Sequence, residues 1–288
     1  SANAVGFTMA PRINAAGRLG SPRLAHELLL ASEHDEAAPL AGRLDEMNTA
    51  RRAEEERIFT AAHEQALNCP DSVGLVLYGE DWHQGVIGIV ASRIVEALYR
   101  PVLILKGSGR SVSEFDLHAG LCQCADVLAG FGGHRQAAGL RLDPKRLPEL
   151  RERFDAAARA ALGDTPLTPS LTIDSELGFA EASDFTVLKA LELLQPFGVG
   201  NPEPVFASTP LLVRKRRVFG HGREHVALDV VEESSGISLQ AKAWRAAEAL
   251  PPSIAGRRLR LAFTPGINAY NGIASIELTV KDWEFLDA

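Results

Sequence analysis

The fold of the first half of the chain is decided by the stretch Val73-Gly-Leu-Val-Leu-Tyr78, which reads as a buried β-strand. A helical pattern follows from Gly85 to Tyr99, and Pro101-Val-Leu-Ile-Leu105 reads as a second buried strand. A strand, a helix and a strand in this order predict a parallel pair of strands joined by a right-handed crossover.

Further helices are expected on both sides of this unit. Downstream, a helix is predicted from Leu117 to Phe131, followed by a glycine turn, and Asp143-Pro144 opens a helix that ends near Leu162. Upstream, Ser21-Pro22 is a helix start, and a long charge-laced helix from Ala37 to Leu67 is typical of a connector between lobes. Residues 70–163 are therefore predicted to be a small α/β domain that follows connecting helices at 21–69.

The second half of the chain has a β pattern. A linker is expected over Gly163 to Pro169 and a short helix near Asp184 to Leu194. Five strands are then predicted from alternating apolar residues, with Asn271-Gly272 in a hairpin turn. These strands are expected near residues 211–218, 226–230, 237–243, 259–263 and 276–280. Residues 164–288 are thus predicted to form a five-stranded barrel of the oligonucleotide-binding (OB) kind after a helix, with a β-sandwich fragment as the alternative.

The composition sets limits on the class of protein. With 46% apolar and 23% charged residues among 288, the chain has the composition of a soluble globular protein, and its apolar runs are too short to cross a bilayer. No secretory signal is found, and three cysteines without a C-x-x-C spacing favour reduced thiols in the cytoplasm. The chain begins at Ser1 and enters at once on residues that read like the middle of a fold, which indicates a fragment.

The charge distribution gives a mixed indication. A net charge of -7 and a pI near 5.7 count against a nucleic-acid binder, which is more often basic. Positive charges nevertheless cluster at Arg214 to Arg217 and at Arg257 to Arg260. Each cluster fits either an interface for a polyanion or the solvated face of a strand.

Residues 107–111, Gly-Ser-Gly-Arg-Ser, form the first candidate site. A glycine-rich loop after a buried strand can turn several N–H groups toward one anion, and hydroxyls with a guanidinium add donors for phosphate oxygens. The alternative is an ordinary turn with an exposed arginine. The residues proposed for phosphate binding are Ser108, Gly109, Arg110 and Ser111.

Two further stretches carry polar residues among small ones. In Phe131-Gly-Gly-His-Arg-Gln-Ala-Ala-Gly139, the glycines Gly132 and Gly133 allow close approach of a ligand and direct the imidazole of His134 outward, although a structural histidine is the alternative. Residues 10–20 carry Arg12, Asn14 and Arg18, which fit an anion site or a loop buried by its small residues. No Asp and His cluster has the spacing of a metal site, since the Asp116–His118 pair alone is weak evidence.

These motifs, taken in order, resemble the RecJ family of the DHH phosphoesterase superfamily. Residues 11–20 resemble the end of its catalytic domain. Residues 82–93, 107–111, 115–118 and 131–134 resemble the DHH-associated domain, and Gln195-Pro-Phe-Gly-Val-Gly-Asn-Pro-Glu-Pro-Val-Phe206 resembles the start of its OB domain. The resemblance implies that residues 1–20 end a DHH catalytic domain whose remainder this chain lacks.

The family is a group of processive 5′-to-3′ exonucleases on single-stranded DNA that act in recombination and repair. Its members use two divalent ions, manganese or magnesium, held by an Asp-His-His motif and other aspartates of the N-terminal domain. This sequence contains no Asp-His-His. The resemblance therefore implies a part that binds single-stranded DNA, holds no metal or other cofactor and has negligible nuclease activity alone. A single-strand-binding protein or a helicase is a candidate partner, and no membrane is involved.

The resemblance also implies roles for particular side chains. Ser108, Arg110 and Ser111 would hold a 5′ phosphate, His134 would stabilise charge on the phosphate under attack, and Asn14 and Arg18 would face the cleft. In the barrel, the strand would be contacted by Arg214, Arg216, Arg217, Phe219 and Tyr270. Of the aromatic residues Phe206, Phe219 and Trp244, at least two are expected in the barrel core.

Two other functions fit the motifs. A DHH phosphodiesterase of short oligonucleotides would share the Gly-Gly-His motif, but it would have little use for the barrel. A non-catalytic RecJ-like module that binds DNA would keep the barrel and the phosphate contacts without a working catalytic half.

Overall fold

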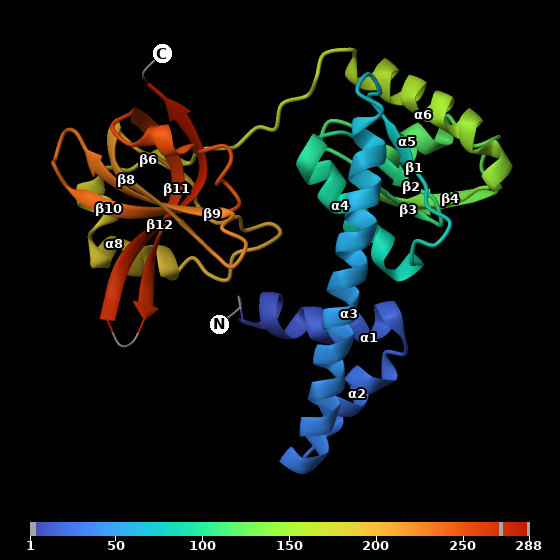
Figure 1. The fold of residues 1–288 in the computed structure, drawn as a ribbon, viewed down its shortest axis with the longest axis horizontal. Coiled ribbons are helices and arrows are strands. Elements are labelled where there is room, and N and C mark those ends of the chain that lie inside the picture. Colours follow the sequence, from blue (N-terminus) through green and yellow to red (C-terminus); the bar gives the residue numbers. More distant parts are fainter. Residues whose placement is uncertain (1–3, 271–272, 287–288) are drawn as a thin grey trace. The chain divides into compact units, whose positions relative to one another are not determined.

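The computed structural model describes residues 4–270 and 273–286, which divide into two compact units, Ser1–Pro169 and Ser170–Ala288. Figure 1 shows a helical and α/β unit followed by a β-rich unit. No helix within these described residues is long and apolar enough to span a membrane. The boundary between the two units follows Pro169. The predicted domain limits at residues 20, 69 and 163 remain predictions.

The first unit begins with helices. A π-helical turn η1 (Ala4–Met9) leads into α1 (Ala10–Leu19), so residues 10–20 form a helix and not the loop that was one interpretation of the sequence. Helix α2 (Arg23–Leu30) follows Ser21-Pro22, where the Ser21 hydroxyl accepts a hydrogen bond from the Arg23 amide at 3.3 Å. The predicted long connector is α3 (His34–Leu67), against which α1 and α2 pack.

The predicted strand–helix–strand unit is present. Strands β1 (Leu75–Leu77) and β2 (Val102–Ile104) are parallel, and α4 (Gln84–Leu98) connects them. Both strands are buried throughout because α4 covers one face of the sheet while α5 (Leu117–Cys122) and α6 (Leu147–Leu162) pack on the other. The prediction of a parallel pair is therefore confirmed.

Three further strands extend this sheet, and the predictions for two of the segments that form them were wrong. Strand β3 (Ser108–Arg110) replaces the predicted glycine loop, β4 (Gly130–Gly133) replaces the predicted helix end and turn, and β5 (Ala137–Arg141) pairs with both in the order β1-β2-β3-β5-β4. Helix α5 covers only the first six residues of the predicted helix. The strands form because Gly109 lacks a side chain where a Cβ would lie 2.7 Å from Leu103, which lets β3 pack tightly.

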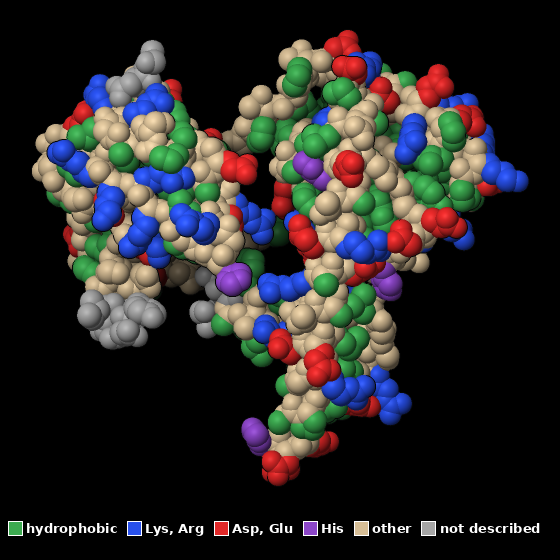
Figure 2. Space-filling view, in the orientation of Figure 1, with side chains coloured by type: hydrophobic (Ala, Val, Ile, Leu, Met, Phe, Trp, Pro, Cys, Tyr) green, Lys and Arg blue, Asp and Glu red, His purple; other side chains and the backbone are tan. Residues whose placement is uncertain are grey.

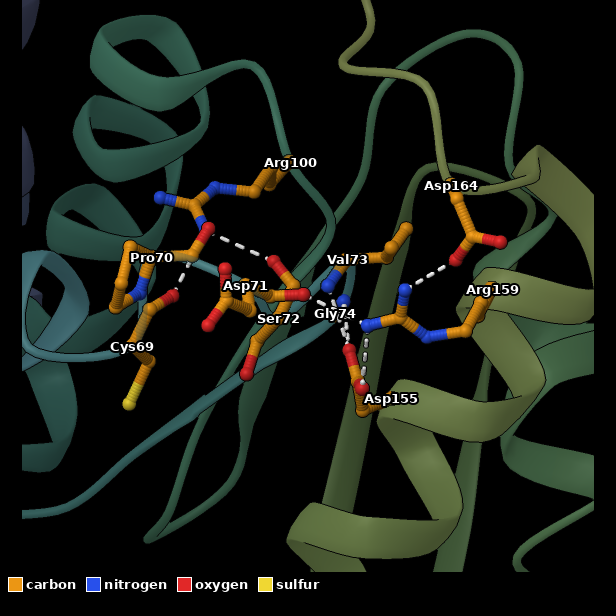
Figure 3. Close-up of polar contacts among 10 residues, drawn as sticks. All are labelled: Cys69, Pro70, Asp71, Ser72, Val73, Gly74, Arg100, Asp155, Arg159 and Asp164. Carbon is orange, nitrogen blue, oxygen red and sulfur yellow. Dashed lines mark hydrogen bonds and ion pairs between the residues drawn. The ribbon is translucent and has the colours of Figure 1, made fainter.

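Polar contacts join helix α6 to the segment that leads into β1 (Figure 3). Helix α6 follows a short 3-10 turn η2 (Pro144–Arg146), which the Asp143 carboxylate caps by accepting the Lys145 amide at 3.0 Å. On α6, the Asp155 carboxylate accepts the amides of Val73 and Gly74, just before β1. The Asp155 carboxylate therefore ties α6 to the edge of the sheet.

Substituting Asp155 by alanine is expected to destabilise the first unit by roughly 1–3 kcal/mol, because two backbone amides lose their acceptor. Denaturant unfolding followed by hydrogen exchange of the β1 amides would measure the change. The matched control is Asp164→Ala, which removes an exposed carboxylate paired with Arg159 and is expected to have little effect. An equal loss in both variants would show that the amide contacts contribute nothing particular.

The second unit is built mainly of strands. Short elements come first: β6 (Ser175–Glu176), α7 (Phe179–Ala182), α8 (Phe185–Glu192) and β7 (Phe206–Ala207). The five predicted strands follow as β8 (Leu211–Phe219), β9 (His225–Glu232), β10 (Ser238–Ala243), β11 (Arg258–Tyr270) and β12 (Ile273–Phe285), with a 3-10 turn η3 (Pro252–Ile254) before β11. The predicted turn residues Asn271 and Gly272 lie outside the described residues.

The pairing of these strands is that of an OB-type barrel. Strands β8, β9 and β10 form an antiparallel meander, β10 pairs in parallel with β12, and β12 pairs with β11. The barrel closes between β11 and β8 through only two residue pairs, so it is partly open. Alternating apolar residues of every strand fill the interior, among them Val213, Leu228 and Phe263, so the predicted barrel is confirmed over the β-sandwich.

Candidate functional site

The first feature of the candidate site is a close contact between α1 and the start of α4. The Arg18 guanidinium donates to the Gly85 carbonyl at 2.9 Å. A Cβ on Gly85 would lie 2.2 Å from the Arg18 carbonyl oxygen, so only glycine allows the two helices to approach this closely. The His83 ring caps the helix by accepting the Gly85 amide at 3.1 Å. This contact brings Arg18 to the surface at the first turn of α4.

A second arginine reaches the same place from β3. Arg110 donates to the Ser108 hydroxyl at 3.2 Å and to the Gly109 carbonyl at 2.7 Å. The Ser108 and Arg110 side chains lie over Gly88 of α4, where a Cβ would be 3.1 Å from the Ser108 oxygen. Burial lowers the pKa of Arg110, and the positive charge of Arg18 lowers it further.

Neither guanidinium has a carboxylate partner within the parts of the chain that the structure describes. Two neighbouring positive charges of this kind repel each other, and a bound anion would relieve that repulsion. The hydroxyl of Ser108 adds a donor between them and the sheet. The Arg18, Ser108 and Arg110 side chains, called the arginine site below, can therefore hold a phosphate.

Beside the arginine site, the same face of the sheet has a floor of glycines. Helix α4 packs over β2 and β3, whereas Gly132 of β4 and Gly139 of β5 pair with each other and are exposed. They line a shallow open pocket together with Gln84, Lys106, Gly107, Gly130, Phe131, Leu140 and Arg141. With no side chains on the floor, the backbone of a ligand can lie directly against the sheet.

His134 stands at the end of this floor and is exposed. Its amide donates to the Ala137 carbonyl at 2.8 Å, which fixes the backbone. The preceding Gly133 has φ +150°, and a Cβ there would lie 2.5 Å from the Ala137 oxygen. The sequence Gly-Gly-His thus places an exposed histidine directly after the strand that carries Gly132.

Other predicted residues of these motifs have structural tasks. Gly109 is buried against Leu103, and the Ser111 hydroxyl donates to the Phe115 carbonyl at 2.9 Å. Since the segment is a strand and the Ser111 amide bonds to Gln136, the predicted nest of free N–H groups is not formed. Asn14 is exposed one turn before Arg18 on α1, whereas Arg12 pairs with Asp45 at 2.8 Å, away from that contact.

The barrel carries a second group of candidate residues on strand β8. Arg214 and Arg217 are exposed, whereas Arg216 donates to the carbonyls of Ala247 (2.8 Å) and Leu250 (2.5 Å) and so holds the turn after β10. The contact of Arg216 with a DNA strand stays a prediction, although two of its nitrogens are occupied by these carbonyls. Tyr270 lies at the end of β11, and its side chain lies outside the described residues.

An aromatic cluster at the end of β8 was missed. Phe219 pairs with His225 of β9, and Trp244 follows β10, with ring centroids 5.5 Å apart for Phe219–Trp244 and 4.7 Å for His225–Trp244. Trp244 is 54% exposed, and Phe219 is only partly buried, while Phe206 packs against the core. The prediction that at least two of Phe206, Phe219 and Trp244 are core is therefore wrong. The alternation of inward Ala241 and Ala243 was a usable signal, because it turns Trp244 outward.

The described residues do not suit a divalent ion. Among them, no group of three or more His, Cys, Asp and Glu side chains lies close enough to share a metal. The Asp116 carboxylate, one half of the weak sequence pair, caps α5 by accepting the Ala119 amide at 3.0 Å. One oxygen of the Asp116 carboxylate therefore serves as the helix cap.

Comparison with known proteins gives the family. The DHHA1 domain model matches residues 71–160, and the RecJ OB domain model matches residues 173–282. Both matches point to RecJ. The chain corresponds to a C-terminal portion of RecJ. The Bacillus subtilis protein is 32% identical over 98% of this chain, which spans 38% of that protein. The Thermus thermophilus protein is 35% identical over 96% of this chain, which spans 40% of that protein. Both are named single-stranded-DNA-specific exonuclease RecJ.

Solved RecJ structures agree with this placement. RecJ from Thermus thermophilus in complex with Mn²⁺ is similar to the whole of this chain with a TM-score of 0.83 at 33% identity, and the match covers 42% of that protein. A second RecJ structure, bound to manganese, matches 57% of this chain at 40% identity with a TM-score of 0.52. The succession of a DHHA1 domain and an OB domain is therefore that of RecJ.

Proposed function

We propose that this chain is the part of a 5′-to-3′ single-stranded-DNA exonuclease that grips the strand and its 5′ phosphate. The observation that carries the proposal is the arginine site, in which Arg18 and Arg110 meet without a carboxylate between them. A terminal phosphate carries more negative charge than an internal one, so a pair of guanidinium groups selects it. The names of the RecJ relatives supply the class of substrate.

Each element of the face then has a task. Arg110 and Arg18 hold the 5′ phosphate, Ser108 donates a further hydrogen bond, and Asn14 contacts the strand from α1. The glycine floor accommodates the first nucleotides. His134 donates a hydrogen bond to an oxygen of the phosphate under attack and stabilises the developing negative charge.

The divalent ions would be held by a part of the protein that this chain does not contain. Manganese or magnesium there would activate water and stabilise the charge of the displacement. Because the described residues offer no group of metal ligands, we propose that this chain alone has negligible nuclease activity. Its own work is to bind and orient the strand.

The barrel would hold the strand farther from its end. Arg214 and Arg217 supply positive charge, Phe219 and Trp244 supply rings on which bases stack, and Tyr270 would add a third ring. Figure 2 shows Lys and Arg side chains spread over the viewed face of the barrel unit. The net charge of -7 is compatible with such binding, since the local distribution decides it.

Substituting Arg110 by alanine tests the proposal. The variant is expected to bind a 5′-phosphorylated oligonucleotide about tenfold more weakly than the wild type, with little change for the same oligonucleotide ending in a 5′ hydroxyl. Arg110→Lys should recover only part of the difference, because lysine lacks the planar fork of donors. Fluorescence anisotropy at fixed salt would measure both affinities.

The control is Arg153→Ala on α6, whose guanidinium pairs with Asp126 and Glu149. It should bind both oligonucleotides like the wild type. If Arg110→Ala weakens both ends equally, the arginine site does not read the 5′ phosphate. In the intact enzyme, the same preference should appear in the rate of digestion.

A further inference from the structure

Two basic residues on the rim of the glycine floor have no assigned task, Lys106 and Arg141. Strand β5 alternates between faces, so Arg141 lies on the same side as Gly139 and Ala137, while Ala138 and Leu140 point into the core. Ala137 pairs with Arg110, which places the arginine site on this side as well. Lys106 lies in the turn between β2 and β3, at φ +83°.

The charge of Arg141 is not compensated. It is exposed, its guanidinium lies over Gly130, where a Cβ would be 3.3 Å from Nη2, and no ion pair of Arg141 is found in residues 4–270 and 273–286. Lys106 donates to the Glu80 carbonyl and slightly lowers the pKa of Asp81, whose main partner is Arg57. Arg141 is therefore the stronger anion ligand of the two.

Two pockets adjoin these cations. The pocket over the glycine floor and a second pocket, lined by Tyr78, Leu105, Leu142 and Pro144, share Lys106, Leu140 and Arg141. The first pocket has a polar backbone floor and the second has an aromatic and aliphatic wall. Such a sequence of surfaces suits a nucleotide chain, with a phosphate between the cations and a base against the wall.

We propose that Arg141, assisted by Lys106, binds an internal phosphate of the same strand whose 5′ end occupies the arginine site. The inference rests on the proposed function. Arg141 is four positions along β5 from the residue that pairs with Arg110, which corresponds to a separation of about 13 Å. The site therefore reads a phosphate downstream of the end and makes binding depend on a minimum length of strand.

The test pairs the loss of Arg141 with the loss of one phosphate charge at a time. A 5′-phosphorylated oligonucleotide is prepared with a neutral methylphosphonate at each successive linkage, and its affinity for the 288-residue chain is measured. For the wild type, a methylphosphonate at one particular linkage near the 5′ end should lower the affinity roughly five- to tenfold. For Arg141→Ala, a methylphosphonate at that same linkage should leave the affinity unchanged. The slope of log affinity against log salt concentration should also be smaller in Arg141→Ala, by about the amount that corresponds to one lost phosphate contact.

Arg141→Lys should restore sensitivity at the same linkage, and Arg43→Ala, on the exposed surface of α3, should leave the whole pattern unchanged. Arg141→Ala with an unaltered pattern, or with equal losses at all linkages, would overturn the proposal. The preference of the same variants for a 5′ phosphate over a hydroxyl reports separately on the arginine site, so failure of the proposed function is distinguishable.

Discussion

Replacing His134 by alanine is expected to lower the turnover of an intact enzyme that contains this chain by about 10²- to 10³-fold, with little change in its affinity for DNA. The reason is geometric. His134 directly follows β4, its side chain is exposed, and its backbone amide is held by the Ala137 carbonyl. A donor in this position contributes most when negative charge develops on the phosphate, and little when the strand is only bound.

Single-turnover rates and equilibrium affinities, measured separately, separate these two effects. His118→Ala is the matched control, since His118 is another exposed histidine of the same unit, on α5 beside the ring of Phe131. It should change neither quantity. Should the affinity fall as much as the rate in His134→Ala, the residue is a binding group and its assignment to the chemical step is wrong.

The sequence predicted the parts of the fold whose patterns are local. Strands β1 and β2 are runs of buried aliphatic residues, and the long helix α3 has regular spacing, so each could be recognised without knowing its neighbours. The barrel strands were recognisable because one face of each is apolar. In all these elements, local propensity and tertiary packing agree.

Strands β3 and β4 were missed because their residues have low strand propensity. Ser108-Gly-Arg110 and Gly130-Phe-Gly-Gly133 carry the composition of turns. They form strands only because β2 and β5 supply hydrogen-bond partners and because Leu103 occupies the space above Gly109. Such long-range compensation has no signature in a local window of sequence.

The candidate site was predicted residue by residue but not as an arrangement. Arg18 and Arg110 were both named, yet their meeting depends on the contact of α1 with Gly85, far along the chain. The contact of Arg216 with the Ala247 carbonyl was not predicted, and the bulge between Val213 and Lys215 shifts the alternation along β8. Neither the helix contact nor the bulge can be read from residue spacing.

Replacing Glu232 by alanine is expected to destabilise the barrel unit by about 3 kcal/mol, the largest effect on stability that we predict. Glu232 is 2% exposed at the end of β9. Its carboxylate accepts the Phe179 amide at 3.0 Å and the Thr209 hydroxyl at 2.6 Å, and it also accepts the Ser235 hydroxyl. Without the carboxylate, the buried Phe179 amide has no acceptor, the half-buried Thr209 hydroxyl loses its partner, and α7 loses a polar attachment to the barrel.

The same carboxylate should make the stability of the barrel depend on pH. Burial alone raises the pKa of Glu232, but the hydrogen bonds from Ser235, Thr209 and the Phe179 amide together lower it by more than burial raises it, so the net shift is downward. A group whose pKa is lower in the folded state stabilises the fold above its unfolded pKa, which is about 4.3 for glutamate. That contribution is lost as the pH falls through the folded pKa, because the unfolded chain takes up the proton first.

Denaturant unfolding at a series of pH values, followed by hydrogen exchange of the β8 and β9 amides, would measure this contribution. The wild-type barrel should lose stability below about pH 4 more steeply than Glu232→Gln, whose side chain cannot titrate. Glu233→Gln is the control, because the neighbouring carboxylate is paired with Arg258 near the surface. If Glu232→Gln keeps the wild-type slope, the hydrogen bonds that lower the pKa of Glu232 do not stabilise the barrel, and the attachment of α7 rests on the packing of Phe179 against Phe263.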